Sequence, residues 1–477
     1  MNETICKEGD SMKKLWCCIM VCLMLFSSFF TVSAFAAHED FDVRSGVLIK
    51  YNGSDVDVTI PAHITAIGNE AFADNTKVQS VKLNDTVRVI GDRAFYGCSA
   101  LRSVTQGDSI AEVGDLAFYG TPYLDNSGDK YVMLGSVLLW YNGTSDSVTI
   151  PSRCTSVASY AFARCEYLKS FTAYEGLTGI GTGAFYGCSK LESVNLPSTL
   201  SAVGAYAFDG TPYLRNSGDF AVAGDGVLLR YQGSDTELEL PGTIKRIASH
   251  AFVSSKLRSV TIPESVYAID AYAFADCTGL ETVQYSEGLV TIGDGAFRGC
   301  KSLSWFKSPE SLSYIGQLAF NGDSAIESAA LRGDHLTVSH NAFKGCDSMQ
   351  YVLMSEGVAQ LYDNAFDGCT ALEGISISPK TTDISASALS GCTNAVVCCE
   401  QDSEAETALS GHMINTVMGD ADGSGVLDVV DATTIQCYIA YLLELNGTQI
   451  ALSDVNFDGV INIIDAYICQ LKTVELL

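Results

Sequence analysis

The sequence predicts an elongated solenoid of short coils, followed by a small helical module with two acidic loops. Two observations carry this prediction: an Ala-Phe pair that recurs every 23 residues, and acidic residues at alternate positions near the C-terminus. The composition of the 477 residues, 47% hydrophobic with 43 glycines, indicates a large core reached through many turns. A formal net charge of −28 argues against nucleic acid or an anionic membrane as a partner.

The N-terminus has the pattern of a secretory signal peptide. Two lysines precede an apolar run over 15–30, and small residues follow at 34–36. We interpret 1–36 as the signal peptide, with Met12 as an alternative to Met1 as the true start. A membrane anchor is the other interpretation, but the apolar run is short for a bilayer. The mature chain is therefore expected to be exported, without a membrane span.

The repeat is defined by an Ala-Phe pair preceded, five residues before the Phe, by an aliphatic residue. Such a constant phase indicates that each unit is one coil, burying its apolar positions against its neighbours. The positions of the Phe, with one Leu, are Phe72, Phe95, Phe118, Phe162, Phe185, Phe208, Phe252, Phe274, Phe297, Phe320, Phe343, Phe366 and Leu389.

Within a unit, the spacing of apolar residues predicts one short strand. Leu191, Val194 and Leu196 have the L-x-x-V-x-L spacing of a strand that lines a core, and Pro197 ends it. The Ala-Phe segment is too short for a full helix and is expected to turn with its Phe inward. At roughly 4.8 Å per coil, about 13 coils would form a gently curved rod on the order of 60 Å long.

The cysteines follow the same repeat. Four of the 17 lie in the leader, and an odd number, 13, remains. Eight share one phase, three residues after the Phe or Leu, which favours buried free thiols over disulfides or a metal site. Adjacent Cys398 and Cys399 have no predicted role. The eight are Cys98, Cys165, Cys188, Cys277, Cys300, Cys346, Cys369 and Cys392.

A second period of 90 residues relates the segments 45–61, 135–151 and 225–241. Asn-Gly pairs at 52–53 and 142–143 lie between apolar runs, which predicts the turns of β-hairpins. We expect each hairpin to cap or interrupt the stack.

Aromatic residues accompany these hairpins at equivalent positions: Tyr51, Tyr141, Tyr231 and, beside the second, Trp140. They are expected to pack the hairpin onto the solenoid, and a ligand platform is the alternative.

Residues 45–418 resemble the BspA-like class of leucine-rich repeats. The resemblance lies in units that end in an I-G-x-x-A-F-x-x-C pattern and in an end piece, 403–417, similar to the terminal cap of that class. It implies a leucine-rich repeat solenoid, commonly a secreted or surface protein that binds proteins or host matrix. No particular ligand is implied.

The segment 419–477 changes character, with nine acidic residues and Lys472 as its only basic one. Oxygen-bearing residues fall at positions 1, 3, 5, 9 and 12 of two loops 34 residues apart, with Gly425 and Gly459 at the sharp turn. This alternation directs side chains and one carbonyl at a calcium ion, as in an EF-hand loop. The predicted ligands are Asp420, Asp422, Ser424, the Val426 carbonyl, Asp428 and Asp431, then Asp454, Asn456, Asp458, the Val460 carbonyl, Asn462 and Asp465.

The loops depart from an ordinary EF-hand, since position 12 is Asp and only an exiting helix follows each loop. The segment resembles a type I dockerin over 419–477. The resemblance implies two calcium ions, calcium-dependent folding, and docking to a cohesin module of a scaffoldin. Aliphatic residues replace the usual hydroxyl pair at positions 10 and 11, which predicts a more apolar interface. The positions that commonly contact cohesin are Val429, Val430, Gln436, Cys437, Ile463, Ile464, Gln470 and Leu471.

No sequence pattern points to catalysis. G-x-S-x-G and H-E-x-x-H are absent, and the six histidines are scattered without ligand or nucleophile spacing. We therefore expect a secreted, non-catalytic cellulosome component acting in polysaccharide catabolism. Its parts are a signal peptide, 1–36; a repeat domain with hairpin and cap, 38–418, that binds a protein or glycan; and a dockerin, 419–477. The alternatives are a polysaccharide lyase or glycoside hydrolase on a β-solenoid, or a free surface adhesin.

Overall fold

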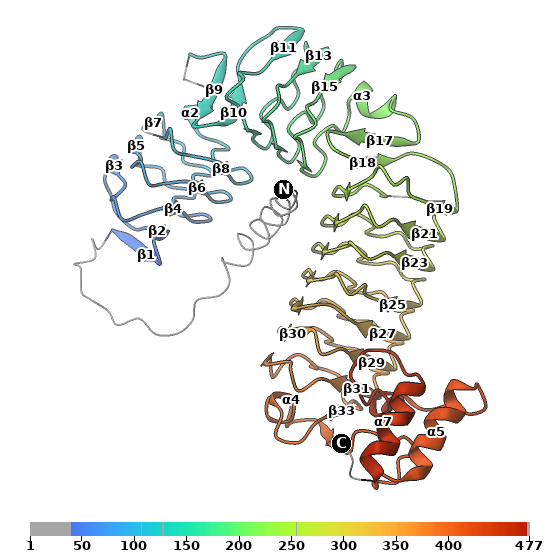
Figure 1. Cartoon of the computed structure of the whole chain (residues 1–477). Helices are drawn as coiled ribbons and strands as arrows, with labels where there is room; N and C mark the ends of the chain where they lie inside the picture. The colour runs from blue at the N-terminus through green and yellow to red at the C-terminus, as the bar shows by residue number, and fades with distance from the viewer. Residues whose placement is uncertain (1–39, 106, 126–127, 254, 475–477) are drawn as a thin grey trace, which may run out of the picture.

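The repeats form an arc-shaped stack of coils that ends in a cluster of helices (Figure 1). The computed structural model describes residues 40–105, 107–125, 128–253 and 255–474. The expected signal peptide, 1–36, lies outside the described residues. Within the described part of the chain, no helix combines the length and apolar character needed to cross a membrane.

Each coil contributes a very short strand, ending in the aliphatic residue of the repeat, to sheets along the inner side of the arc (Figure 1). Neighbouring strands are parallel and in register at the repeat length, so that Ile67 lies beside Ile90. The strands of these three sheets are β1 (Phe41–Arg44), β2 (Val47–Tyr51), β4 (Ala66–Ile67), β6 (Val89–Ile90) and β8 (Glu112–Val113); β9 (Tyr131–Leu134), β10 (Val137–Tyr141), β12 (Ser156–Val157), β14 (Gly179–Ile180) and β16 (Ala202–Val203); β17 (Phe220–Ala223), β18 (Val227–Tyr231), β20 (Arg246–Ile247), β22 (Ala268–Ile269), β24 (Thr291–Ile292), β26 (Tyr314–Ile315), β28 (Leu336–Val338), β30 (Val358–Leu361) and β32 (Asp383–Ile384).

The L-x-x-V-x-L segments form a second series of sheets along the outer side of the arc. These strands are also parallel, with Val260 beside Val283. Their bounds are β3 (Asp57–Thr59), β5 (Ser80–Lys82), β7 (Ser103–Thr105), β11 (Ser147–Thr149), β13 (Ser170–Thr172), β15 (Ser193–Asn195), β19 (Glu237–Glu239), β21 (Ser259–Ile262), β23 (Thr282–Tyr285), β25 (Trp305–Lys307), β27 (Ser328–Leu331), β29 (Tyr351–Met354), β31 (Gly374–Ile377), β33 (Val396–Cys399) and β34 (Met413–Asn415). The solenoid predicted from the repeat is confirmed. The prediction of one strand per unit was wrong, because a coil contributes a second strand, which ends in the aliphatic residue of the repeat, to the inner sheets.

The repeated Phe residues stack on one another through the core. The ring centroid of Phe320 lies 5.2 Å from that of Phe297 and 4.9 Å from that of Phe343, with the rings nearly parallel. A constant phase in sequence thus becomes a column of stacked rings within each of the three core clusters. Short helices α2 (Pro122–Asp125), α3 (Pro212–Arg215) and α4 (Glu404–Ala408) connect parts of the stack.

Three hairpins divide the inner sheets, but the Asn-Gly turn prediction was wrong. The antiparallel pairs are β1–β2, β9–β10 and β17–β18, and each first strand starts a new sheet. The Asn-Gly pairs follow the second strand instead, where the chain passes to an outer sheet. In the first hairpin the chain there passes around Tyr51, whose hydroxyl accepts a hydrogen bond from the Asp55 N–H at 3.3 Å. A Cβ on Gly53 would lie 2.4 Å from that hydroxyl, which explains the glycine.

The hairpin tyrosines pack against the aromatic column, as expected. Tyr51 and Tyr141 are buried, and each ring centroid lies 5.0 Å from that of the next Phe in the column. Tyr231 repeats this arrangement with Phe252 at 5.5 Å. Trp140 is half-buried.

The cysteines of the described residues are free, and most of the repeat cysteines are buried, as predicted. The Sγ of Cys98 donates to the carbonyl of Phe72, one coil earlier, at 3.0 Å, and Cys188 does the same to Phe162. The thiol therefore adds a second hydrogen bond to a carbonyl that already accepts one within its own turn, from the Asn75 N–H in the case of Phe72, and this contact between coils accounts for the phase. Burial raises the pKa of the Cys98 thiol to about 11.

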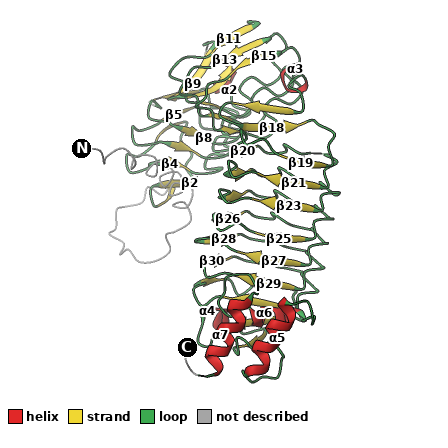
Figure 2. Ribbon diagram, turned by 45° about the vertical axis from the view of Figure 1, so that its right-hand side comes forward, coloured by secondary structure: helices red, strands yellow, loops and turns green. Residues whose placement is uncertain are grey.

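Three helices form the C-terminal module: α5 (Val429–Ile439), α6 (Gly447–Ser453) and α7 (Ile463–Thr473) (Figure 2). Their N-caps are Asp428, Asn446 and Asn462, each completed by a capping box. Helices α5 and α7 pack over a small core that includes Ile435 and Cys469. Helices α5 and α7 were predicted from the sequence and α6 was not, although the Asn446 capping box was a signal for it.

Candidate calcium-binding and docking site

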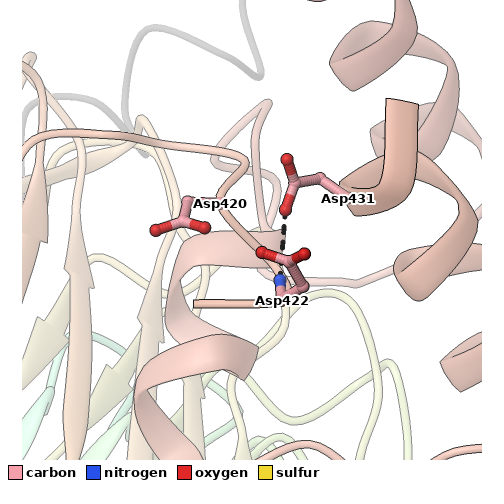
Figure 3. Close-up of side chains that lie close together, drawn as sticks. All are labelled: Asp420, Asp422 and Asp431. Atoms are coloured by element: carbon pink, nitrogen blue, oxygen red, sulfur yellow. Dashed lines mark hydrogen bonds between the residues drawn. The ribbon is translucent and has the colours of Figure 1, made fainter. Parts of the chain in front are cut away.

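The first acidic loop brings three carboxylates together (Figure 3). Oxygen atoms of Asp420, Asp422 and Asp431 all lie within 4.8 Å of one another. The loop backbone holds two of these side chains, because the Gly425 N–H donates to Asp420 Oδ2 at 2.9 Å and the Asp422 N–H donates to Asp431 Oδ1 at 3.1 Å. Gly425 has a φ of +82°, as the sharp turn requires.

The second loop repeats this hydrogen-bond pattern. The Gly459 N–H donates to Asp454 Oδ2 at 3.1 Å, and the Asn456 N–H donates to Asp465 Oδ1 at 3.4 Å. Asp454 and Asp465 are fully buried. Two loops 34 residues apart in sequence therefore have the same backbone frame.

The other predicted ligands of the first loop lie along it but make local hydrogen bonds. Ser424 Oγ donates to the Val426 carbonyl at 3.1 Å, and Asp428 Oδ1 accepts from the Val430 N–H at the start of α5.

In the second loop, Asn456 Nδ2 donates to Asp458 Oδ2 at 3.0 Å, and Asn462 Nδ2 donates to the Val460 carbonyl at 3.1 Å. Among the described residues, a cluster of three carboxylates occurs only in the first loop.

The donor set fits a hard divalent cation. Every predicted ligand offers oxygen, which calcium prefers over nitrogen or sulfur. Asp420 Oδ1 is buried and has no hydrogen-bond partner, and such an atom is costly unless a cation satisfies it. Calcium would neutralise these converging charges, while Asp420, Asp422 and Asp431 would hold it in the first loop.

Burial changes the acidity of the second loop. Desolvation, reinforced by Asp465 and Asp458, raises the pKa of Asp454 to about 7. Desolvation likewise raises the pKa of Asp465 to about 6. In the more exposed first loop, hydrogen bonds to Ser424 lower the pKa of Asp422.

We expect calcium binding at the second loop to release protons near neutral pH. Because the ion needs ionised Asp454 and Asp465, affinity there should fall by about tenfold per pH unit between the pKa values of Asp454 and Asp465, and by about a hundredfold per pH unit below both. Calorimetric titration at pH 6 in two buffers with different ionisation enthalpies measures the released protons. Without calcium, the stability of the module should depend on pH in the opposite direction. The pKa values of Asp454 and Asp465 in the folded state exceed that of aspartate in the unfolded chain, so folding favours their protonated forms. The module should therefore be most stable below about pH 4 and lose stability as the pH rises through 7. A calcium affinity independent of pH between 5.5 and 7.5 at both loops would contradict this assignment.

The predicted cohesin-contact residues lie mainly on the surface of α5 and α7. Val429 and Val430 are 63% and 49% exposed, and Ile463 and Ile464 are 61% and 51% exposed. Gln436 and Gln470 are also exposed, whereas Cys437 and Leu471 are half-buried.

Further exposed apolar residues of the module were not predicted from the sequence, among them Leu443 and Val474. Tyr467, which follows Ile463 by one helical turn, and Tyr441 and Leu442 after α5 are exposed to solvent. The helical spacing of Tyr467 was a signal that could have identified it.

The fold and the loops together define a leucine-rich repeat solenoid that carries a dockerin. The family described as the BspA type leucine-rich repeat region matches residues 51–127, 138–217, 230–350 and 277–396. The chain belongs to this family. The type I dockerin domain matches residues 418–470.

Solved structures similar to the chain include three bacterial proteins. A leucine-rich cell surface protein from Faecalibacterium prausnitzii is 25% identical, over 80% of this chain and 98% of that one, with a TM-score of 0.28. The pneumococcal vaccine antigen PcpA is 18% identical over 81% and 99%, with a TM-score of 0.34. A leucine-rich repeat protein from Bacteroides ovatus is 20% identical over 81% and 99%, with a TM-score of 0.29. No curated protein matches the chain.

Proposed function

We propose that this chain is a secreted, non-catalytic component of a cohesin–dockerin assembly that acts in polysaccharide catabolism. Residues 1–36 direct export, 38–418 bind a ligand, and 419–477 bind a cohesin module of a scaffoldin in the presence of two calcium ions. The observation that carries the proposal is the pair of exposed aliphatic residues that begins each duplicated helix, directly after an intact acidic loop. Exposed apolar groups on a small module favour a protein partner.

The repeats supply the second binding function. Tyr119, Tyr167 and Tyr174 are each more than half exposed on the described surface, and such side chains contribute strongly to interfaces. The ligand of this surface is a protein or a glycan. Attachment through the dockerin places the chain at a cell surface or in an extracellular complex.

Two alternatives make different predictions. A polysaccharide lyase or glycoside hydrolase would degrade substrate without any partner, and the lyase would release unsaturated uronides. A free surface adhesin would bind its ligand equally well without calcium. The absence of catalysis is supported by the two matched modules, since repeats of this class and dockerins are binding modules.

The test immobilises the mature protein in calcium and exposes it to secreted and surface fractions of the producing cell. Elution with EGTA, followed by mass spectrometry, should release a cohesin-bearing protein, while ligands of the repeats stay bound. Release of no cohesin would refute the docking function. Depolymerisation of a polysaccharide by the pure protein would refute the non-catalytic assignment.

The duplicated helices predict redundancy in docking. In Val429→Asp/Val430→Asp, the apolar start of α5 becomes charged, but the equivalent start of α7 is intact, so cohesin affinity should fall less than tenfold. Adding Ile463→Asp/Ile464→Asp should reduce affinity by more than 1,000-fold, because neither helix then offers an apolar contact. Surface plasmon resonance against the captured cohesin measures both. The redundancy means that the module can dock in two orientations, one through α5 and one through α7. Complete loss of binding in the first double variant would refute this.

A further inference from the structure

The C-terminal module is packed against the last coils of the solenoid rather than suspended from them. Helix α6 lies on the outer sheet, where the Gly447 N–H donates to Glu373 Oε2 at 2.7 Å and Thr448 Oγ1 donates to the Glu373 carbonyl at 2.8 Å. The two backbones approach so closely that a Cβ on Gly374 would lie 2.4 Å from the Gly447 carbonyl oxygen. This contact therefore depends on glycine at two positions far apart in sequence.

An apolar cluster forms the centre of this joint. Cys398 of β33 is buried with Met418, Ala451, Leu452 and Phe457. The adjacent Cys399 points to the other face of β33, into the solenoid core. The alternation of a strand thus gives each of the two cysteines a separate structural role.

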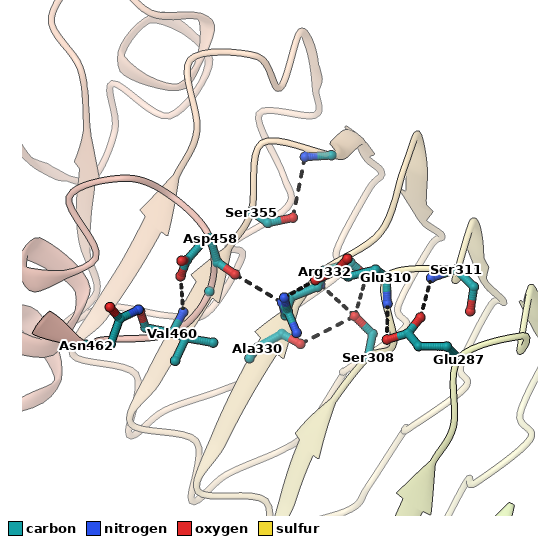
Figure 4. A network of polar contacts seen from close by, with 12 residues as sticks. Glu287, Ser308, Glu310, Ser311, Ala330, Arg332, Ser355, Asp458, Val460 and Asn462 are labelled. Atoms are coloured by element: carbon teal, nitrogen blue, oxygen red, sulfur yellow. Dashed lines mark hydrogen bonds and ion pairs between the residues drawn. The ribbon is translucent and has the colours of Figure 1, made fainter. Parts of the chain in front are cut away.

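The second acidic loop contacts the repeats through its main chain. Arg332 Nε donates to the Asp458 carbonyl at 3.1 Å (Figure 4). The Glu356 N–H donates to the Phe457 carbonyl at 3.0 Å. An ion pair with Glu310 orients the Arg332 guanidinium. Among the described residues, the hydrogen bonds of the first loop, 420–431, stay within the module, except that the Asp420 N–H donates to the Val417 carbonyl of the adjoining cap at 3.1 Å.

We propose that calcium in the second loop locks the dockerin onto the repeat stack, whereas calcium in the first loop only orders α5. The carbonyls of Phe457 and Asp458 belong to the turn that wraps around the ion. Without calcium, Asp454, Asp458 and Asp465 repel one another, and the turn loses the shape that Arg332 and Glu356 recognise. When calcium is present, the solenoid is held in one fixed orientation relative to a scaffold bound to the dockerin. When calcium is absent, that orientation is lost. This inference rests on the calcium part of the proposed function and not on cohesin binding.

The chain contains a reporter for this joint. Trp305 lies in a cleft between the outer sheet and the module, lined also by Tyr351, Tyr438, Ile450 and Ile461. Trp140 lies far from the joint, and the third tryptophan, Trp16, is in the expected signal peptide. Trp140→Phe therefore leaves Trp305 as the single tryptophan of the mature chain.

The experiment titrates calcium into mature Trp140→Phe protein while tryptophan emission is recorded, with calorimetry in parallel. We expect a blue shift as the module closes over Trp305. The added change Asp454→Ala should abolish the shift, whereas Asp420→Ala should only reduce it, because Tyr438 of α5 is one lining residue of the cleft while Ile450 and Ile461 stay in place. Arg332→Ala should weaken calcium binding at the second loop by about 5–10-fold, because coupling between two contacts is reciprocal.

The matched control is Arg258→Ala. Arg258 also forms an outer-sheet ion pair, with Glu281, but it does not contact the module. Its replacement should therefore change neither the Trp305 emission shift nor the calcium affinity. Calcium binding by calorimetry without any change in Trp305 emission would overturn the lock while leaving the calcium sites intact. Equal loss of the shift in Asp420→Ala and Asp454→Ala would also overturn it. No binding by calorimetry would refute the calcium sites themselves, and the lock with them.

Discussion

Replacing Phe320 with alanine is expected to lower the free energy of unfolding of the repeat stack by about 3–5 kcal/mol, the usual cost of removing a fully buried aromatic side chain. The ring is 0% exposed and lies between Phe297 and Phe343. Its loss leaves a cavity that neither neighbour can fill, because each is held by the next ring in the column. Urea unfolding of the mature protein in calcium, followed by far-UV circular dichroism, measures the loss.

The effect should extend along the stack. In a solenoid each coil is stabilised by contacts with its two neighbours, so a defect in the middle weakens the coupling between the parts on either side. We therefore expect the variant to unfold in two steps. Tyr186→Ala is the matched control, since Tyr186 follows the column residue of its coil and is 43% exposed. That change should cost no more than about 0.5 kcal/mol. Similar losses in both variants would show that the column does not dominate stability.

Features that repeat in phase could be predicted from the sequence. The Ala-Phe period predicted the inward-facing Phe residues, and the L-x-x-V-x-L segment predicted the outer strands. Each copy of the repeat is independent evidence that the same position is buried. The hairpin turns were misplaced because Asn-Gly is a local signal that several chain reversals share. The Asn-Gly pair at 52–53 instead lets the chain pass around the ring of Tyr51. That role depends on a contact with a side chain outside the dipeptide, which the dipeptide alone does not reveal.

The acidic loops were also predictable, since ligand spacing within 12 residues is a local property. The joint between the module and the solenoid was not. Arg332 and Asp458 are 126 residues apart, and no periodic pattern connects them. Cys398 had no predicted role, yet it is buried beneath α6. Such contacts arise only once two separately folded units are brought together.

Removing both calcium sites should unfold most of the C-terminal module. A ligand present at 1,000 times its dissociation constant stabilises a protein by about 4.1 kcal/mol per site, so two sites contribute about 8 kcal/mol. That is close to the whole stability of a domain of this size, at about 0.05–0.15 kcal/mol per residue. In Asp420→Ala/Asp454→Ala, each loop loses its first ligand, and the remaining carboxylates repel one another. We expect α5 and α7 to unfold.

Circular dichroism at 222 nm measures this directly, because α5 and α7 have 11 residues each, whereas α2 and α3 have only four each among the described residues. EGTA should remove most of the helical signal from the unaltered protein, and the double variant should show the reduced signal even in calcium. Asp85→Ala, which removes an exposed acidic residue from the repeats, is the control and should leave the signal unchanged. Helix α6 should survive in part, because its apolar side packs on Cys398 of the repeats as well as on Phe457 of the second loop. A full helical signal in EGTA would mean that packing on the repeats, and not calcium, folds the module.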